Sequence, residues 1–248
     1  MREPAPHTAR LTAGERVRGY AVHGFTASGV VVAFLAAAEI CAPQPDPRRV
    51  FVLFALATLI DAADGPLARR WRVKETAPEI DGRTIDDIVD FLTFTFLPLL
   101  LVWRMGWVPD PGAAWLAPAL LASILGFANH MAKDEARGFF RGFPSYWNVA
   151  AFYAGFLSPG ANAVMFVALA ALTVAPVWFI YPNLAPRPWK TPLLVGAFLW
   201  LVLAILMLRD YPDAPRWMLW LSLLYPALYT AASVHLDRKT RGRSAAPG

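Results

Sequence analysis

The chain has 248 residues, of which 57% are hydrophobic and 17% charged, and it carries a formal net charge of +5 and one cysteine. Soluble domains typically contain about 45–50% apolar residues, so long apolar runs are compared with a lipid bilayer first. The lone Cys41 excludes an internal disulfide framework, and we interpret it as a passive helix-end residue. The basic residues lie in short segments between apolar runs, which argues against a nucleic-acid-binding face.

Eight apolar runs are candidates for membrane helices. In chain order they cover about 19–41, 50–70, 84–104, 112–131, 145–158, 161–182, 191–209 and 215–236. The run 145–158 is the weakest, because about 14 residues at 1.5 Å each reach only about 21 Å across a hydrocarbon core of about 30 Å. We expect it to be tilted into the bundle, extended upstream or re-entrant.

The predicted fold class is all-α, a polytopic transmembrane bundle of about eight helices with both termini in the cytoplasm. One membrane domain, 19–236, follows a cytoplasmic N-terminal segment, 1–18, and precedes a tail, 237–248, that is expected to be disordered. The orientation rests on the positive-inside rule. Of the 23 basic residues, outside segments hold only Arg48, Arg49, Arg104, Arg209 and Arg216. No cleavable signal peptide is expected, because the first 18 residues are polar and basic.

Four aspartates lie within or beside the second and third runs: Asp61, Asp64, Asp86 and Asp90. An unpaired Asp near mid-membrane costs about 2.5–3.5 kcal/mol on insertion scales, so these groups need compensation. Spacings of three and four place each pair on one helix face, and four carboxylates can therefore converge. One or two Mg²⁺ or Mn²⁺ ions would offset the repulsion, with phosphate oxygens completing the coordination. The alternative is that these are helix-end aspartates that cap helices or pair with nearby arginines.

Small residues accompany the aspartates. Gly65 and Gly82 remove side chains where a nucleotide or phosphate must approach the backbone, and Ala68 lets neighbouring helices come close. Arg69 follows Asp64 by about one turn and could fork onto a phosphate oxygen, or its side chain could snorkel to the cytoplasmic surface.

The string Asp61-x-x-Asp64-Gly65-x-x-Ala68-Arg69, then twelve residues, then Gly82-x-x-x-Asp86-x-x-x-Asp90, resembles the signature of the CDP-alcohol phosphotransferases, with all eight signature residues present. The gap between its halves is longer than usual in that family and is similar to that of its bacterial phosphatidylcholine synthase branch. Further segments resemble that branch over about residues 17–235: Ala21-Val22-His23, Gly65 to Arg70, Phe140 to Pro144, Trp147 to Tyr153, and Tyr181-Pro182.

The resemblance implies that a small alcohol attacks the phosphorus next to diacylglycerol in CDP-diacylglycerol and expels CMP. It implies four ligands for two Mn²⁺ or Mg²⁺ ions, Asp61, Asp64, Asp86 and Asp90. It implies a CDP- and phosphate-binding set, Asp61, Asp64, Gly65, Ala68, Arg69 and Gly82. Asp90 would act as general base, with Asp86 beside it in the catalytic set. Asp87 falls outside the signature, while Asp81 and Glu79 could help at the cytoplasmic rim.

The acceptor implied by the resemblance is choline, whose quaternary ammonium has no hydrogen-bond donor and favours aromatic faces. Tyr146, Trp147 and Tyr153 are the candidate wall of a choline site, with the aromatic belts of membrane proteins as the alternative.

Basic residues before this wall, and one histidine in the first run, have two explanations each. Lys133, Arg137 and Arg141 could receive the diphosphate or anionic headgroups, or could reflect topology alone. His23 could lie near the nucleotide, although a hydrogen-bonded histidine between helices is the more ordinary explanation.

The resemblance thus implies transfer of a phosphatidyl group from CDP-diacylglycerol to choline. The alternatives are the same chemistry with serine, glycerol phosphate or inositol phosphate, or a cation transporter whose aspartates bind the ion. The expected partners are both substrates and the lipid bilayer, without nucleic acid, and a homodimer is left open. We expect the protein in the bacterial inner membrane, with the active site near the cytoplasmic face.

Overall fold

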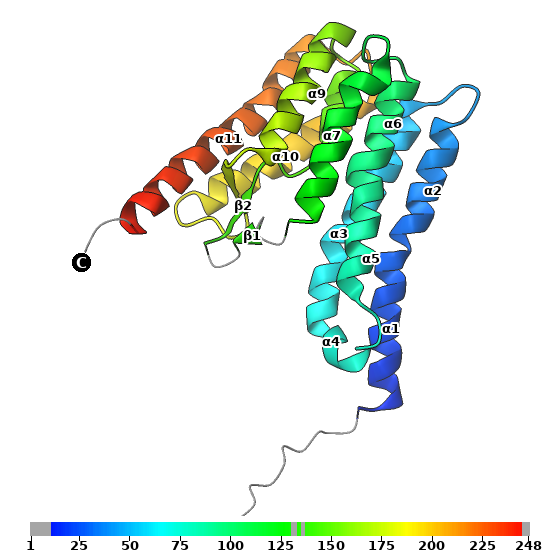
Figure 1. Cartoon of the computed structure of the whole chain (residues 1–248), viewed down its shortest axis with the longest axis vertical. Helices are drawn as coiled ribbons and strands as arrows, with labels where there is room; N and C mark the ends of the chain where they lie inside the picture. The colour runs from blue at the N-terminus through cyan, green and yellow to red at the C-terminus, as the bar shows by residue number, and fades with distance from the viewer. Residues whose placement is uncertain (1–10, 130–132, 135–136, 245–248) are drawn as a thin grey trace, which may run out of the picture.

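The computed structural model describes residues 11–129, 133–134 and 137–244, without the side chains of 133 and 241–244. Helices that run side by side along the long axis make up most of it (Figure 1). In chain order they are α1 (Ala13–Ala27), α2 (Gly29–Ile40), α3 (Pro47–Arg70), α4 (Val73–Thr76), α5 (Gly82–Asp90), the π-helix η1 (Phe91–Phe96), α6 (Leu97–Arg104), α7 (Gly112–Phe127), α8 (Trp147–Ala154), α9 (Pro159–Val174), α10 (Lys190–Arg209) and α11 (Arg216–Ser244).

Four helical stretches are long and apolar enough to cross a membrane: 13–40, 47–70, 190–209 and 216–240. The apolar helices α7 and α9 are shorter. Before α7 in the chain, α5, η1 and α6 follow one another directly from Gly82 to Arg104, where the sequence predicts the third span. Large apolar side chains such as Phe34 and Phe198 are exposed, as expected for groups that face lipid. The chain is therefore an integral membrane protein, while the count of about eight spans stays a prediction.

The weakest predicted span, 145–158, contains only the eight-residue helix α8. This helix is buried in the main core, where Trp147 and Phe152 pack with Phe51, Phe54 and Tyr211. Of the three expected possibilities, an upstream extension of this helix is wrong, because strand β2 and a turn precede α8. A tilted or re-entrant path stays a prediction.

A small antiparallel sheet departs from the all-α prediction. Its strands β1 (Lys133–Asp134), β2 (Phe139–Arg141) and β3 (Trp178–Ile180) pair in the order β1-β2-β3. Phe139 and Ile180 pack on α10 and α11. The predicted span 161–182 is therefore too long, because α9 ends at Val174, two residues before Pro176, and the backbone at Ala175 is extended. A proline disfavours the helical conformation of the residue before it.

The structure shows helix within both predicted terminal segments. Helix α1 begins at Ala13 inside the predicted 1–18 segment, because Thr12 and Glu15 form a reciprocal capping box. The tail 237–248 is not disordered throughout, since α11 continues to Ser244. Arg137 donates hydrogen bonds to Asp237 (3.1 Å) and Thr240 (2.9 Å), which ties the end of α11 to the segment between β1 and β2.

The two helices that carry the aspartates both pack on α1 and α2. Glycines allow this close approach. A Cβ on Gly19 would lie 2.5 Å from the Thr76 hydroxyl, and a Cβ on Gly29 would lie 2.5 Å from a Val89 methyl group. Because real Cβ contacts are never so short, α1 and α2 can hold α4 and α5 at this distance only with glycine.

Candidate active site

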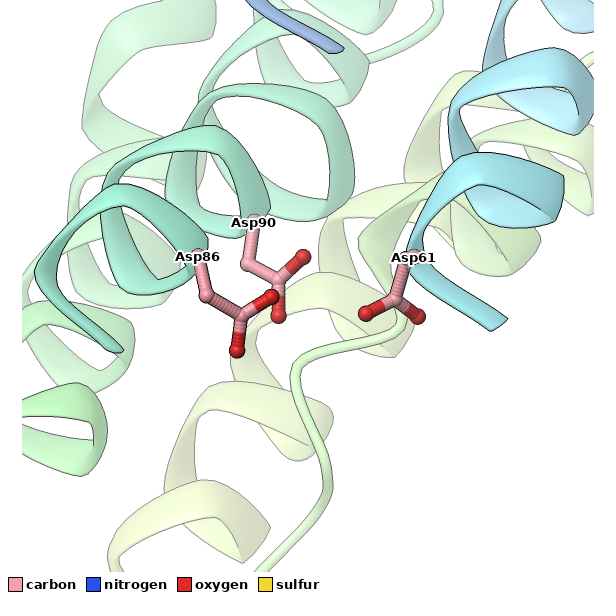
Figure 2. Close-up of side chains that lie close together, drawn as sticks. All are labelled: Asp61, Asp86 and Asp90. Atoms are coloured by element: carbon pink, nitrogen blue, oxygen red, sulfur yellow. The ribbon is translucent and has the colours of Figure 1, made fainter. Parts of the chain in front are cut away.

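Three of the four predicted carboxylates meet between α3 and α5. Asp61, Asp86 and Asp90 each offer an oxygen, and these oxygens all lie within 4.8 Å of one another. Figure 2 shows Asp86 and Asp90 projecting from one helix toward Asp61 on its neighbour. Asp86 and Asp90 are four residues apart, so they share a face of α5, as the spacing predicts. We call these three residues the acidic triad.

The acidic triad fits a divalent cation. Its donors are carboxylate oxygens, which Mg²⁺ and Mn²⁺ prefer. Within the described part of the chain, the buried Oδ1 of Asp90 has no hydrogen-bond partner. A buried acceptor without a partner is costly, and a bound cation would remove that cost together with the repulsion among the three charges.

Asp64 lies outside the acidic triad. A residue three positions after Asp61 is displaced by about 4.5 Å along the helix and about 60° around it, so the spacing alone does not bring both carboxylates to one point. Asp64 is buried and interacts with the Thr26 hydroxyl on α1. It remains close enough to Asp90 to interact with it electrostatically.

A cavity of about 850 Å³ opens beside the acidic triad. Five of the six residues predicted to bind CDP and phosphate line it: Asp64, Gly65, Ala68, Arg69 and Gly82. Asp61, the sixth, does not. Asp86 belongs both to the lining and to the acidic triad, so the cavity and the carboxylates form one continuous site.

The rim of the cavity carries four cations: Arg69, Arg72, Lys74 and Arg83. Two of them are already paired, Arg72 with Glu75 and Arg83 with Asp87 at 3.6 Å. For Arg69 and Lys74, no ion pair or hydrogen bond is found with any residue that the structure describes. These two side chains are therefore the best placed to receive phosphate oxygens.

Glu79 and Asp81 also line this rim, but both are occupied by the protein. Glu79 pairs with Arg16 at 2.8 Å and accepts a hydrogen bond from Tyr20. Asp81 caps α5. The hydrogen bond from the Thr84 hydroxyl lowers the pKa of Asp81, so this carboxylate stays ionised at the helix start. Both residues stabilise the cavity wall.

The two glycines face different groups. A Cβ on Gly82 would lie 2.8 Å from Cε1 of His23, so this glycine makes room for the buried imidazole in the cavity wall. A Cβ on Gly65 would lie 3.4 Å from the Arg69 guanidinium, an ordinary contact. His23 Nε2 lies 3.4 Å from the carbonyl oxygen of Ala77, which agrees with the interpretation of His23 as a histidine held between helices.

The three candidate choline residues lie in different surroundings. Trp147 is fully buried and donates a hydrogen bond to Ser123 (2.6 Å). Tyr153 is buried between Ser222 and Trp200 and hydrogen-bonds to both. Tyr146 is 46% exposed and interacts electrostatically with Asp61 and Asp90. Of the three, only Tyr146 is accessible next to the acidic triad.

The candidate basic residues lie in the sheet. Arg137 is held by Asp134, Asp237 and Thr240, which gives it a structural role, and Arg141 is exposed at the end of β2. The side chain of Lys133 is outside the described residues.

Sequence reasoning missed several residues of the site. Thr26 and Lys74 line the cavity. Tyr181, Tyr225 and Tyr229 lie near Tyr146. Tyr181 belongs to a segment that resembles the family branch, but the resemblance gave it no role. No local pattern marks the other four as site residues, because they come from segments that meet only in the folded chain.

A metal-compatible acidic triad on membrane helices, continuous with a cavity that has cations at its rim, is the arrangement expected of a membrane phosphotransferase. No family model matches the chain. Individual proteins of known name are similar to it. The chain is 33% identical over 222 residues to a phosphatidylcholine synthase of Rhizobium johnstonii, covering 88% of this chain and 90% of the relative. It is 36% identical over 231 residues to that of Bradyrhizobium diazoefficiens (91% and 84%), and 33% identical over 213 residues to that of Pseudomonas aeruginosa (85% and 88%). The chain therefore belongs to the phosphatidylcholine synthase branch of the CDP-alcohol phosphotransferase family.

Proposed function

We propose that this chain transfers the phosphatidyl group of CDP-diacylglycerol to choline and releases CMP. The observation that carries the proposal is the acidic triad, in which Asp86 also lines the cavity beside it. The phosphatidylcholine synthases to which the chain is similar over most of its length support the same chemistry. The chain is thus a phosphatidyltransferase of phospholipid synthesis.

The cavity is the proposed site of the CDP group. Gly65 and Ala68 leave the α3 side of the wall without long side chains, so a nucleotide can approach the helix. Arg69 and Lys74 would neutralise the pyrophosphate oxygens. Asp64, which lines the same cavity, would face the pyrophosphate.

The acidic triad would hold one or two Mg²⁺ or Mn²⁺ ions, with Asp64 beside it. When bound, the cations would neutralise charge on the pyrophosphate and on the leaving CMP. The residues themselves position the reaction: α3 and α5 fix Asp61 and Asp86 on opposite sides of the space into which Asp90 points (Figure 2).

Asp90 is the proposed general base. The choline oxygen attacks the phosphorus next to diacylglycerol, the bond from that phosphorus to the CMP oxygen breaks, and the hydroxyl proton passes to the Asp90 carboxylate. Its buried Oδ1 has no hydrogen-bond partner within the described chain and can accept a proton. Asp86, one turn earlier, would hold the cation beside it.

The finer topology belongs to the same proposal. The chain would lie in a bacterial inner membrane with about eight spans and both termini cytoplasmic, and a homodimer is left open. The cavity, lined by the basic segment from Arg69 to Arg83, would then open at the cytoplasmic face, where CMP is released.

The decisive experiment offers choline, serine, glycerol 3-phosphate and inositol phosphate in parallel to purified protein with CDP-diacylglycerol and Mn²⁺. The lipid product is identified, and CMP release is measured with and without each acceptor. Phosphatidylcholine formation that requires both choline and metal supports the proposal. A different lipid would redirect it to another acceptor, and no CMP release with any acceptor would reject the enzyme assignment in favour of ion transport.

A further inference from the structure

Four tyrosines gather next to the acidic triad, and we call them the tyrosine cluster: Tyr146, Tyr181, Tyr225 and Tyr229. The Tyr146 ring packs on Phe94, four residues after Asp90, with centroids 6.2 Å apart, and it interacts electrostatically with Asp61, Asp90, Tyr181 and Tyr225. Tyr229 interacts with the other three tyrosines. Tyr146 is therefore the member of the cluster nearest the acidic triad along the chain of contacts, and the other three come from the end of β3 and from α11.

Packing fixes the two tyrosines of α11. The Tyr229 hydroxyl donates a hydrogen bond to the carbonyl oxygen of Ile180 (3.0 Å), and its ring stacks on Phe179 with centroids 6.0 Å apart. The Tyr225 ring stacks on Tyr229 at 6.3 Å. It also lies against Gly196 of α10, where a Cβ would come within 2.7 Å of the ring. These rings are held in place before any ligand binds.

Tyr146 is presented by an unusual backbone turn. Ser145 has φ of 56°, a left-handed conformation that residues other than glycine rarely adopt. Its hydroxyl donates to Ser123 (3.2 Å), and Ser145 and Trp147 are both buried. Tyr146, between them, is 46% exposed. The turn therefore directs one aromatic side chain out of a buried segment and toward the carboxylates.

We propose that the tyrosine cluster binds the trimethylammonium group of the acceptor and so selects choline; this inference rests on the proposed function. Only two carbons separate the choline hydroxyl from its nitrogen, so a hydroxyl that reaches Asp90 must place the cation within the next few ångströms. A quaternary ammonium has no hydrogen to donate, and aromatic faces with nearby negative charge are its preferred surroundings.

An aromatic belt at the membrane interface is the ordinary explanation for tyrosines in such a protein. It does not account for this arrangement, in which residues from the turn before α8, the end of β3 and the middle of α11 gather together, with Tyr146 packed on Phe94, one turn after Asp90. Belt residues face lipid headgroups, whereas Tyr225 and Tyr229 stack on each other and on protein rings.

The test measures KM for choline and KM for CDP-diacylglycerol in Tyr146→Leu, Tyr146→Phe, Tyr225→Leu and Tyr225→Phe. Loss of a cation–π contact at a partly desolvated site should raise the choline KM about tenfold in each Leu variant. The Phe variants should keep most of the affinity, because the ring remains. The KM for CDP-diacylglycerol should change less than about twofold, which also shows that the variants fold. Trp217→Leu, which removes an exposed aromatic of the same helix, is the control and should match wild type.

A second measurement compares choline with N,N-dimethylethanolamine, whose protonated nitrogen can donate a hydrogen bond. The preference for choline should fall in the Leu variants and persist in the Phe variants. If both Leu variants keep the wild-type choline KM and preference while forming phosphatidylcholine, the cluster is not the choline site and the proposed function stands. If wild-type protein does not use choline at all, the proposed function itself fails.

Discussion

The variant Asp90→Asn distinguishes the contribution of Asp90 to catalysis from its contribution to the stability of the site. The substitution keeps the shape of the side chain but removes its charge and its ability to take a proton. General-base catalysis contributes about 10²–10⁴ in rate, so kcat should fall by that factor, equivalent to about 3–5 kcal/mol. The assay is CMP release from CDP-diacylglycerol at saturating choline and Mn²⁺.

The same substitution should not destabilise the metal-free protein. Oxygens of Asp61, Asp86 and Asp90 lie within 4.8 Å of one another, and two unit charges at that distance repel by about 3 kcal/mol at an effective dielectric constant of about 20. Asn at position 90 removes two of these repulsions whenever the carboxylates are ionised. The melting temperature of the metal-free variant should therefore be equal to or above that of wild type.

Asp87→Asn is the matched control for Asp90→Asn. Asp87 lies on the same helix, outside the acidic triad, in a partly exposed ion pair with Arg83. Such pairs contribute about 0–1 kcal/mol, so this variant should keep most of its activity. Near-normal turnover in Asp90→Asn would refute the general-base assignment. Recovery of turnover at high Mn²⁺ would show instead that Asp90 acts only as a metal ligand.

Three further predictions concern the metal, the cavity wall and the end of α11. Chelation with EDTA should stop CMP release, and added Mn²⁺ or Mg²⁺ should restore it and stabilise the protein by about 2.7 kcal/mol at a hundred times Kd; an unchanged rate after chelation would contradict the metal site. Gly82→Ala should raise the KM for CDP-diacylglycerol several-fold, because the added methyl group displaces His23 at a cost of about 1–3 kcal/mol. In the control Gly14→Ala, no atom lies within 4 Å of the added Cβ, so the KM for CDP-diacylglycerol should not change. Equal KM values in the two variants would contradict the proposed role of Gly82 in the cavity wall. Arg137→Ala should cost about 1 kcal/mol and speed hydrogen exchange in the last turns of α11, since the bond to Asp237 is lost; unaltered exchange would show that this contact does not hold the helix.

Much of the acidic site could be predicted from the sequence, because its spacing is local. Asp86 and Asp90 share a helix face by periodicity alone, and the cost of charge in an apolar run indicates that they need a common partner. Asp64 was expected both among them and in the nucleotide site; it lines the cavity but lies outside the triad, since a spacing of three turns it about 60° away from Asp61. Whether this rotation removes Asp64 from the triad depends on the position of the facing helix α5, which the sequence does not give.

Other features could not be read from the sequence. The π-helix that begins at Phe91 directly follows Asp90, and π-helices, which are rare, occur often at functional sites. No residue pattern in the sequence predicts this π-helix. The three-stranded sheet was missed because strands of two or three residues are too short to show an alternating pattern. Trp147 and Tyr153 seemed equivalent to Tyr146, because burial within a helix that is apolar on all sides cannot be assigned from periodicity.

The acidic triad with its cavity and the proposed acceptor side are built from different parts of the chain. The carboxylates and the cavity come from residues 22 to 90, on helices that pack on α1 and α2, so their geometry is set by neighbouring elements. The proposed acceptor side comes from a turn, the end of a short strand and α11. The strand and α11 pack together through aromatic rings, and Tyr146 of the turn packs on Phe94 of η1. A substitution among those rings can reshape the space for the acceptor without moving the acidic triad. Acceptor choice should therefore respond to changes after residue 140, whereas turnover with any acceptor should respond to changes before residue 91.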